Sequence, residues 1–158
     1  MSILTKNIII DPKFLTPMID EHLFYELKNK YERTCCPDNG FIISIDEILY
    51  IDNIINKDSI MITFMITFKA QTIKPVKDMI LSFIPTLIIS KGIFGKIYDN
   101  INFYIPDNNL NENEFIFDEK LLCFKNKDKK IDNTKEIIVK IDQFICDTLK
   151  YNCIVTLV

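Results

Sequence analysis

The residue types that carry out chemistry are few in this chain, and their spacing builds no recognisable catalytic set. His22 is the single histidine, and Glu21 is its neighbour along the chain. A histidine-activated nucleophile needs a Ser or Cys, the histidine and an orienting carboxylate in one constellation, which this sequence does not offer. It also lacks a phosphate-binding GxxxxGK[ST] loop and a zinc-binding HExxH motif. We therefore expect a protein without an active site or cofactor of its own.

Metal ligation is equally poorly supported by the sequence. Structural zinc sites usually take paired C-x2-C motifs, whereas Cys35 and Cys36 are adjacent and have no second pair nearby. Glu112, Glu114 and Asp118 could offer oxygen ligands, but a solvated polar edge explains them as well. The five cysteines are an odd number, and the first residues lack the pattern of a secretory signal peptide. We expect no metal, free thiols, a reducing compartment and a protein that is not secreted.

Composition and charge exclude further classes of protein. The chain has 31 Ile, 18 Lys and 14 Asn against one Ala and one Arg, a bias that an AT-rich genome explains. The net charge is −3, whereas an autonomous nucleic-acid-binding domain is usually strongly basic. Any contact with RNA must therefore be weak or made within a larger assembly. No apolar run approaches the roughly 18 residues that a membrane span needs, so we expect no membrane partner.

The first half of the sequence predicts a helix packed on an antiparallel sheet. Asp11-Pro12 suits a helix entry, and Pro17 should separate a short first turn from the main helix. Apolar residues alternate along the later strands, which places Ile43 and Ile45 together on one side. The expected elements are a strand over Ile3–Ile10, a helix over Met18–Tyr31, a turn over Pro37–Gly40, a strand over Phe41–Ile51, a polar loop over Asp52–Asp58 and a strand over Ser59–Thr72.

The second half predicts a small all-β domain beyond a boundary at Lys74-Pro75. Short strands separated by turn signals are typical of a five-stranded OB-type barrel. The expected strands are Lys77–Ile89 with a bend at Pro85, Ile93–Tyr98, Ile101–Ile105, one or two within Glu114–Phe124, Glu136–Thr148 and Asn152–Val158, with loops over Pro106–Asn113 and Lys125–Lys135. The predicted fold class is α+β, with one domain over residues 1–76 and an OB/S1-like barrel over residues 77–158.

Three stretches resemble the stalk subunit of archaeal and eukaryotic DNA-directed RNA polymerases, the family of the seventh subunit of RNA polymerase II. They are D-P-K-F-L-T-P at Asp11–Pro17, E-R-T-C-C-P-D-N-G-F-I-I-S-I at Glu32–Ile45 and I-T-F-K-A-Q-T-I-K-P-V-K-D-M-I at Ile66–Ile80. The family has Gly where this chain has Asp78. Further on, G-I-F-G-K-I at Gly92–Ile97 is similar to the S1-type OB domain of the same family, although Lys91 stands where an aromatic residue is common.

The resemblance implies a non-catalytic subunit whose N-terminal domain docks on the polymerase core near the clamp. The implied docking residues are Pro17, Pro37, Asp38, Asn39, Gly40 and Phe41. The implied partners are the largest polymerase subunits, a neighbouring small core subunit and a small helical stalk partner. Lys74, Pro75 and Lys77 would form a stiff joint between the domains, with an ordinary linker as the alternative. A short, AT-biased member resembles the versions of large DNA viruses, which implies host-cell cytoplasm and virion, or otherwise the nucleus.

The barrel would offer a weak surface for nascent RNA or transcription factors. OB barrels bind single strands by stacking bases on exposed aromatic side chains in a basic groove, and the candidates here are Lys91, Phe94, Lys96 and Tyr104. Because neighbouring strand residues face opposite ways, only one of Phe103 and Tyr104 can be exposed. Two interpretations are open for a further set of lysines: they contact RNA phosphates, or they belong to a solvated loop. The set is Lys120, Lys125, Lys127, Lys129 and Lys130. A free-standing single-strand-binding protein and a small enzyme are the alternative functions.

Overall fold

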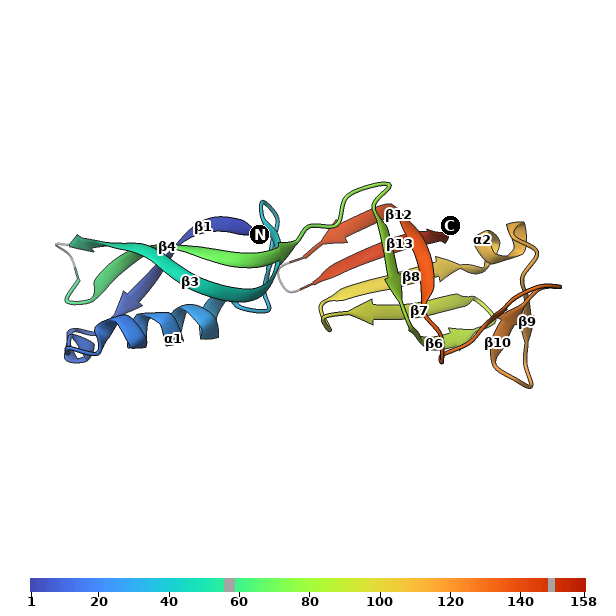
Figure 1. The fold of residues 1–158 in the computed structure, drawn as a ribbon, viewed down its shortest axis with the longest axis horizontal. Helices are drawn as coiled ribbons and strands as arrows, with labels where there is room; N and C mark the ends of the chain where they lie inside the picture. Colours follow the sequence, from blue (N-terminus) through green and yellow to red (C-terminus); the bar gives the residue numbers. More distant parts are fainter. Residues whose placement is uncertain (56–58, 148–149) are drawn as a thin grey trace. The chain divides into compact units, whose positions relative to one another are not determined.

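The computed structural model describes residues 1–55, 59–147 and 150–158 of the chain. These residues form two compact units, an N-terminal unit over Met1–Ile73 and a C-terminal unit over Lys74–Val158 (Figure 1). The division falls at the Lys74-Pro75 pair that the sequence marks as a boundary. Each unit has its own sheet and its own buried side chains.

The N-terminal unit is an antiparallel sheet with one helix along its face (Figure 1). Its elements are β1 (Ser2–Ile10), the 3-10 helix η1 (Pro12–Phe14), α1 (Ile19–Tyr31), β2 (Cys35–Cys36), β3 (Gly40–Ile55) and β4 (Ile62–Ile73), and the sheet order is β1-β4-β3-β2. The predicted helix entry is confirmed, because the Asp11 carboxylate accepts the Lys13 N–H at 3.0 Å and Pro12 opens the turn.

The core of the N-terminal unit lies between α1 and the facing side of the sheet. Leu23 and Leu27 are the buried residues of the helix. They pack with buried residues of β1 and with the alternate positions Phe64, Ile66, Phe68 and Ala70 of β4. The alternation predicted for this strand is therefore confirmed. Ala70, the only alanine, has no exposed surface at all, so a larger side chain there would have to displace its neighbours.

Strand β3 departs from its prediction in length and in periodicity. It continues through the predicted loop to Ile55, because Asn53 and Ile54 still pair with β4. Its register with β4 shifts three times, between Ile42 and Ser44, Ile45 and Glu47, and Ile48 and Tyr50. Each bulge adds one residue to the strand, so the core-facing positions Ile42, Ile45, Ile48 and Ile51 recur every three residues. The predicted placement of Ile43 beside Ile45 is therefore wrong.

The C-terminal unit is built on a sheet that curls into a half-barrel of OB type (Figure 1). Its elements are β5 (Ile80–Phe83), β6 (Pro85–Ile89), β7 (Gly92–Ile97), β8 (Ile101–Pro106), α2 (Asp107–Glu112), β9 (Ile116–Asp118), β10 (Cys123–Lys125), β11 (Lys130–Ile131), β12 (Ile137–Cys146) and β13 (Tyr151–Leu157). The order β5-β12-β13-β8-β7-β6 has β5 and β6 at opposite edges. Only Ile84 separates these two strands, so one bent segment supplies both edges and the sheet must curl. The predicted α+β fold class is confirmed.

Two predicted loops of this unit contain regular structure. Residues Asp107–Glu112 form α2, whose Leu110 is fully buried. Burial of this one leucine outweighs an Asn-rich composition that by itself favours a loop. Within the predicted loop Lys125–Lys135, β11 pairs with β10 and completes a small sheet of order β11-β10-β9. This sheet is inserted between α2 and β12.

Candidate RNA-contact face and docking residues

Three of the four candidate RNA-contact residues, Phe94, Lys96 and Tyr104, lie on the outer side of β7 and β8, whereas Lys91 stands in the turn before β7. Phe94 and Tyr104 are register partners, and their rings stack with centroids 4.7 Å apart at 22°. The Tyr104 hydroxyl donates a hydrogen bond to the backbone oxygen of Lys91 at 3.0 Å. Lys96 follows Phe94 by two residues and so points to the same side of the sheet. In an OB barrel the second and third strands, here β7 and β8, form the ligand-binding face.

The neighbouring aromatic residue, Phe103, faces the barrel interior, as the alternation predicts. It is 1% exposed and stacks on Phe83 at a centroid distance of 5.0 Å. Tyr104 is half-buried on the opposite side. Gly92 also lies close to this ring, because an added β-carbon there would lie 2.7 Å from the Tyr104 Cε2 atom. Phe94 and Gly92 are thus both close neighbours of the Tyr104 ring.

Two apolar side chains that sequence reasoning missed extend this face. Leu87 on β6 is the register partner of Phe94, and Ile154 on β13 is the partner of Tyr104. Leu87 is 53% exposed and Ile154 38%. We call Leu87, Phe94, Tyr104 and Ile154 the outer row. Alternation divides each strand into two sides, but the sheet order and register are needed to place residues of four strands on one shared side.

The electrostatic attraction of the barrel for phosphate is limited. The C-terminal unit contains twelve Lys and twelve Asp or Glu residues, so its net charge is zero; the N-terminal unit has seven Lys or Arg and ten Asp or Glu, a net charge of −3. Lys96 pairs with Asp99 at 3.2 Å, and both side chains are largely exposed. Such a pair stabilises by about 0–1 kcal/mol, so it can open at little cost to an incoming phosphate.

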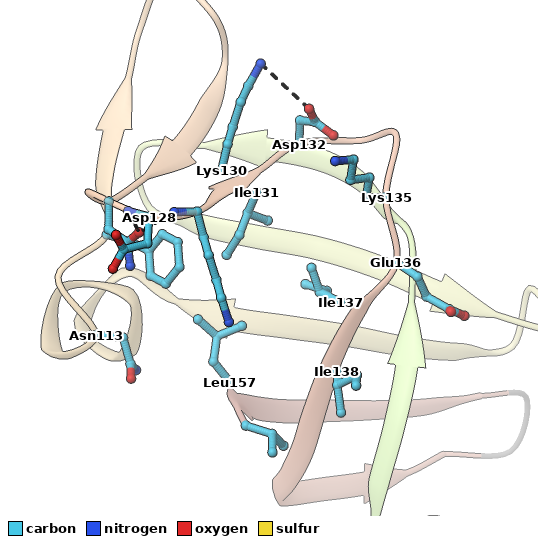
Figure 2. A pocket seen from close by; sticks show the side chains of 14 residues that line it. Asn113, Asp128, Lys130, Ile131, Asp132, Lys135, Glu136, Ile137, Ile138 and Leu157 are labelled. Atoms are coloured by element: carbon cyan, nitrogen blue, oxygen red, sulfur yellow. Dashed lines mark hydrogen bonds and ion pairs between the residues drawn. The ribbon is translucent and has the colours of Figure 1, made fainter.

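The lysine-rich segment borders a hollow of about 680 Å³ between the inserted sheet and the start of β12 (Figure 2). Figure 2 shows Lys130 and Asp132 joined at its rim by their 3.7 Å ion pair. Lysines and carboxylates are equal in number around the hollow: Lys129, Lys130 and Lys135 against Asp128, Asp132 and Glu136. This balance favours a solvated polar rim over a phosphate-binding site.

The carboxylates of this region already have partners. Lys125 pairs with Asp118 at 2.7 Å, and hydrogen bonds from Lys125 and from the Leu121 backbone hold the pKa of Asp118 below its usual value. Asp132 accepts hydrogen bonds from the Thr134 side chain and backbone, which lower its pKa. Both groups are therefore ionised at neutral pH, and the lysines beside them are partly neutralised.

The predicted docking residues lie at opposite ends of the N-terminal sheet. Phe41 is the register partner of Ile73, where the chain leaves the unit, whereas Ile10, which precedes the Pro17 segment, pairs with Ile62 at the far end of β4. Twelve residues of β4 separate the ends, roughly 35–40 Å at the usual rise per residue. The structure therefore does not bring Pro17 and the Pro37–Phe41 turn together.

The Pro37–Phe41 turn exposes fewer of its residues than the sequence suggests. Pro37 and Asp38 are exposed, Asn39 is half-buried, and Gly40 and Phe41 are buried. Gly40 has φ 85°, in the left-handed region that glycine adopts without strain. Of the two side chains that this turn could present, Asp38 is exposed, whereas the Phe41 side chain has no exposed area.

The joint between the units contains a strained residue. Lys74 and Lys77 are exposed and Pro75 is buried. Asp78 has φ 68°, and its N–H donates to the Ile141 oxygen at 2.8 Å, which ties it to β12. A left-handed backbone disfavours most side chains and suits glycine, which is the residue that the resemblance to the stalk subunits implies at this position.

Neither a catalytic site nor a metal site gains support from the described residues. His22 stacks on Phe14 with centroids 4.4 Å apart. Within residues 1–55, 59–147 and 150–158 there is no group of three His, Cys, Asp or Glu side chains that could hold a metal ion. In the same residues, no helix has the length and apolarity needed to cross a lipid bilayer.

Comparison with known proteins finds a family model and a relative that are similar to part of this chain. Residues 5–61 match the SHS2 domain found in the N terminus of Rpb7p, Rpc25p and MJ0397. The chain is 27% identical over 95 residues to DNA-directed RNA polymerase II subunit 7 of Arabidopsis thaliana, in a match that covers 60% of this chain and 54% of that relative. The match thus spans about half the length of the relative. Residues 5–61 are thus similar to the SHS2 domain of the Rpb7 type, and both comparisons support the resemblance to the polymerase stalk subunits.

Proposed function

We propose that the protein is a non-catalytic stalk subunit of a multisubunit DNA-directed RNA polymerase. The observation that carries this is the combination of an SHS2 domain of the Rpb7 type with an OB-type half-barrel in one chain. The relative that matches is a polymerase II subunit. The partners of the N-terminal unit would be the largest polymerase subunits, a neighbouring small core subunit and a small helical stalk subunit. Its location would follow the polymerase: cytoplasm and virion for a viral chain, the nucleus otherwise.

The test is purification of the tagged full chain at low salt from the cells that express it. We expect the two largest polymerase subunits to co-purify in about equal amounts with the tagged chain. If the chain is instead an OB-type protein that works alone, the large polymerase subunits will not co-purify with it. That result would overturn the assignment.

Docking uses the end of the N-terminal unit that carries Pro17. The chain leaves the unit beside Phe41, so a barrel that extends away from the polymerase requires contact at the other end. Pro17 and Met18 are exposed there, the latter by 60%. The Pro37–Phe41 turn is the alternative docking element.

Charge variants at the two ends separate these possibilities. Met18→Glu should abolish co-purification of the large subunits, whereas Asp38→Lys should leave it unchanged. Both side chains are exposed, so neither variant should unfold the unit. If only Asp38→Lys released the polymerase, the docking end would be the turn.

The outer row and the lysines beside it are the surface for nascent RNA. Phe94 offers a ring face, Lys96 offers a cation on the same side of β7, and Lys91 is an exposed lysine in the turn that precedes this strand. Base stacking on an aromatic side chain is worth about 1–3 kcal/mol. We expect Phe94→Ala to weaken binding of a single-stranded RNA to the full chain by at least tenfold. The control is Tyr25→Ala, which removes an aromatic side chain of α1 that is 61% exposed. Equal affinities of all three proteins would contradict the proposed RNA contact.

A further inference from the structure

An acidic groove on the N-terminal unit lies between the start of α1 and the middle of β3. It has a volume of about 560 Å³ and lies wholly within residues 20–51. Its apolar lining comes from Phe24 on the helix and from residues of the bulged strand. The lining residues are Asp20, Glu21, Phe24, Asp46, Glu47, Ile48, Leu49, Tyr50 and Ile51.

The apolar side chains of this groove are incompletely covered by the unit itself. Leu49 is 40% exposed and Tyr50 59%, while Phe24, Ile48 and Ile51 are half-buried. Leu49 and Tyr50 are exposed because a bulge separates Ile48 from Tyr50 in the register with β4. A bulge re-aims the side chains of a strand. The result is an apolar strip that runs along the edge of the sheet.

The charge of the groove has one sign. All four charged residues that line it are acidic, and no lysine or arginine is among them. Glu47 is paired with Lys69 at 2.9 Å, and Asp46 accepts a hydrogen bond from Gln71 at 2.8 Å. Asp20 and Glu21 have neither an ion pair nor a side-chain hydrogen bond within the described part of the chain. These two carboxylates therefore supply most of the uncompensated negative charge.

The Phe24 ring already contacts a cation of its own helix. The Lys28 ammonium lies 4.8 Å from the centroid of the Phe24 ring, a distance typical of a cation–π contact. Lys28 comes from the next turn of α1 and does not line the groove.

Pairing of a partner strand with β3 is the less suitable mode of binding. Among the described residues, β2 pairs only with Gly40 and Phe41, so the edge of β3 beyond Ile45 has no strand neighbour. The bulges at Asp46 and Leu49 interrupt the regular spacing of backbone groups, and bulges of this kind protect sheet edges from strand addition. Recognition at this groove must therefore rely on side chains.

We propose that this groove binds a basic segment of a partner protein, in which an aliphatic side chain stands between two lysines or arginines. The aliphatic group would pack on Phe24, Ile48 and Leu49, and the cations would meet Asp20 and Glu21 on one side and Asp46 on the other. A nucleic acid is excluded by the charge of the rim. The proposal rests on the groove alone and does not depend on the polymerase assignment.

The test is an NMR titration of the 15N-labelled full chain with synthetic peptides. The probe is a capped octapeptide of alternating lysine and leucine; the comparison peptides alternate glutamate with leucine and lysine with serine. We expect the lysine–leucine peptide to shift the amide signals of Glu21, Phe24 and Ile48–Ile51, and to bind at least about tenfold more tightly than either comparison peptide. Shifts confined to other residues, or equal binding of the lysine–serine peptide, would overturn the proposal.

Matched variants test the two halves of the site separately. The double change Asp20→Asn and Glu21→Gln should weaken the lysine–leucine peptide about tenfold, while Glu26→Gln, on the same helix outside the groove, should not. Leu49→Ser should weaken it about fivefold, while Ile54→Ser, an exposed residue of the same strand, should not. The proposal would be contradicted if a groove variant and its control weakened the peptide equally. It would also be contradicted if a single-stranded RNA shifted the same amide signals.

Discussion

At the scale of single residues, Cys36 differs in its surroundings from the other four cysteines. Burial alone would raise the pKa of its thiol, but hydrogen bonds from the Asn39 and Asp38 backbone, the Lys6 ammonium and the Asn39 amide together lower it below the ordinary value. The Lys6 nitrogen lies 3.7 Å from the sulfur. A thiolate is the nucleophilic form of cysteine, so Cys36 gains reactivity where a buried thiol loses it.

This contrast predicts two pH profiles for alkylation of the native chain. Burial raises the pKa of Cys153 to about 11. We expect iodoacetamide to modify Cys36 at a lower pH than an ordinary thiol and to leave Cys153 unmodified up to about pH 10. Lys6→Met removes a cation that favours the thiolate, so the Cys36 profile should move to higher pH. Site-resolved mass spectrometry measures both; coincident profiles for Cys36 and Cys153 would show that the hydrogen bonds do not act as described.

A second residue-scale prediction concerns the left-handed backbone of Leu122. This residue has φ 50° and is 61% exposed in the turn between β9 and β10. A left-handed backbone costs an ordinary residue about 1–2 kcal/mol. Glycine avoids this cost, but its greater flexibility in the unfolded chain offsets part of the gain. Leu122→Gly should therefore stabilise the C-terminal unit by about 0.5–1 kcal/mol.

Its neighbour gives the matched control. Leu121 is 60% exposed in the same turn but does not have a positive φ, so Leu121→Gly should destabilise by about 0.5–1 kcal/mol. Urea denaturation of both variants measures the difference. The same sign for both changes would mean that backbone strain at Leu122 is not relieved by glycine.

At the scale of elements, the half-barrel depends on close contact between β7 and β5. Gly95 lies on β7, and a β-carbon there would lie 2.1 Å from the Phe83 ring. Phe83 is 2% exposed and stacked on Phe103, so it cannot easily move. Gly95→Ala should destabilise the C-terminal unit by about 2–3 kcal/mol.

A compensating change makes this prediction specific. Phe83→Leu removes the part of the ring that meets the new methyl group, so Gly95→Ala should cost less in that background than in the wild-type chain. Hydrogen exchange at the amides of β7 and β8 measures both costs. Additive costs would show that the two positions do not contact each other as described.

At this scale, the features that the sequence could predict are those set by residues close together in the chain. The cap at Asp11, the helix end near Tyr31 and the alternation of β4 are set by neighbouring residues, and they were predicted correctly. The bulges of β3 and the helix α2 were missed, since cross-strand register and the burial of Leu110 depend on residues distant in the chain. The Phe94–Tyr104 pair was found by resemblance, whereas Leu87 and Ile154 needed the sheet order.

At the scale of the whole molecule, charge is divided unevenly between the units. The N-terminal unit has a net charge of −3 and the C-terminal unit of zero. A neutral barrel attracts RNA only through the few cations near its binding face. Lys91 and Lys96 are the lysines beside the outer row, so about two phosphates should be neutralised per RNA bound. Under the proposed function, RNA contact this weak would be strengthened by the place of the chain in a larger assembly.

This count predicts a shallow salt dependence for RNA binding to the full chain. Two phosphate contacts on a single strand give a slope of about −1.4 in log K against log salt, so affinity should fall about sevenfold between 50 and 200 mM salt. Lys91→Gln should reduce the slope by about 0.7, while Lys120→Gln, in the β9–β10 turn, should not change it. Fluorescence anisotropy with a labelled single-stranded RNA measures all three slopes. A slope near −4 would require about six contacts, and the lysines around the hollow beside β11 would then have to be part of the RNA surface.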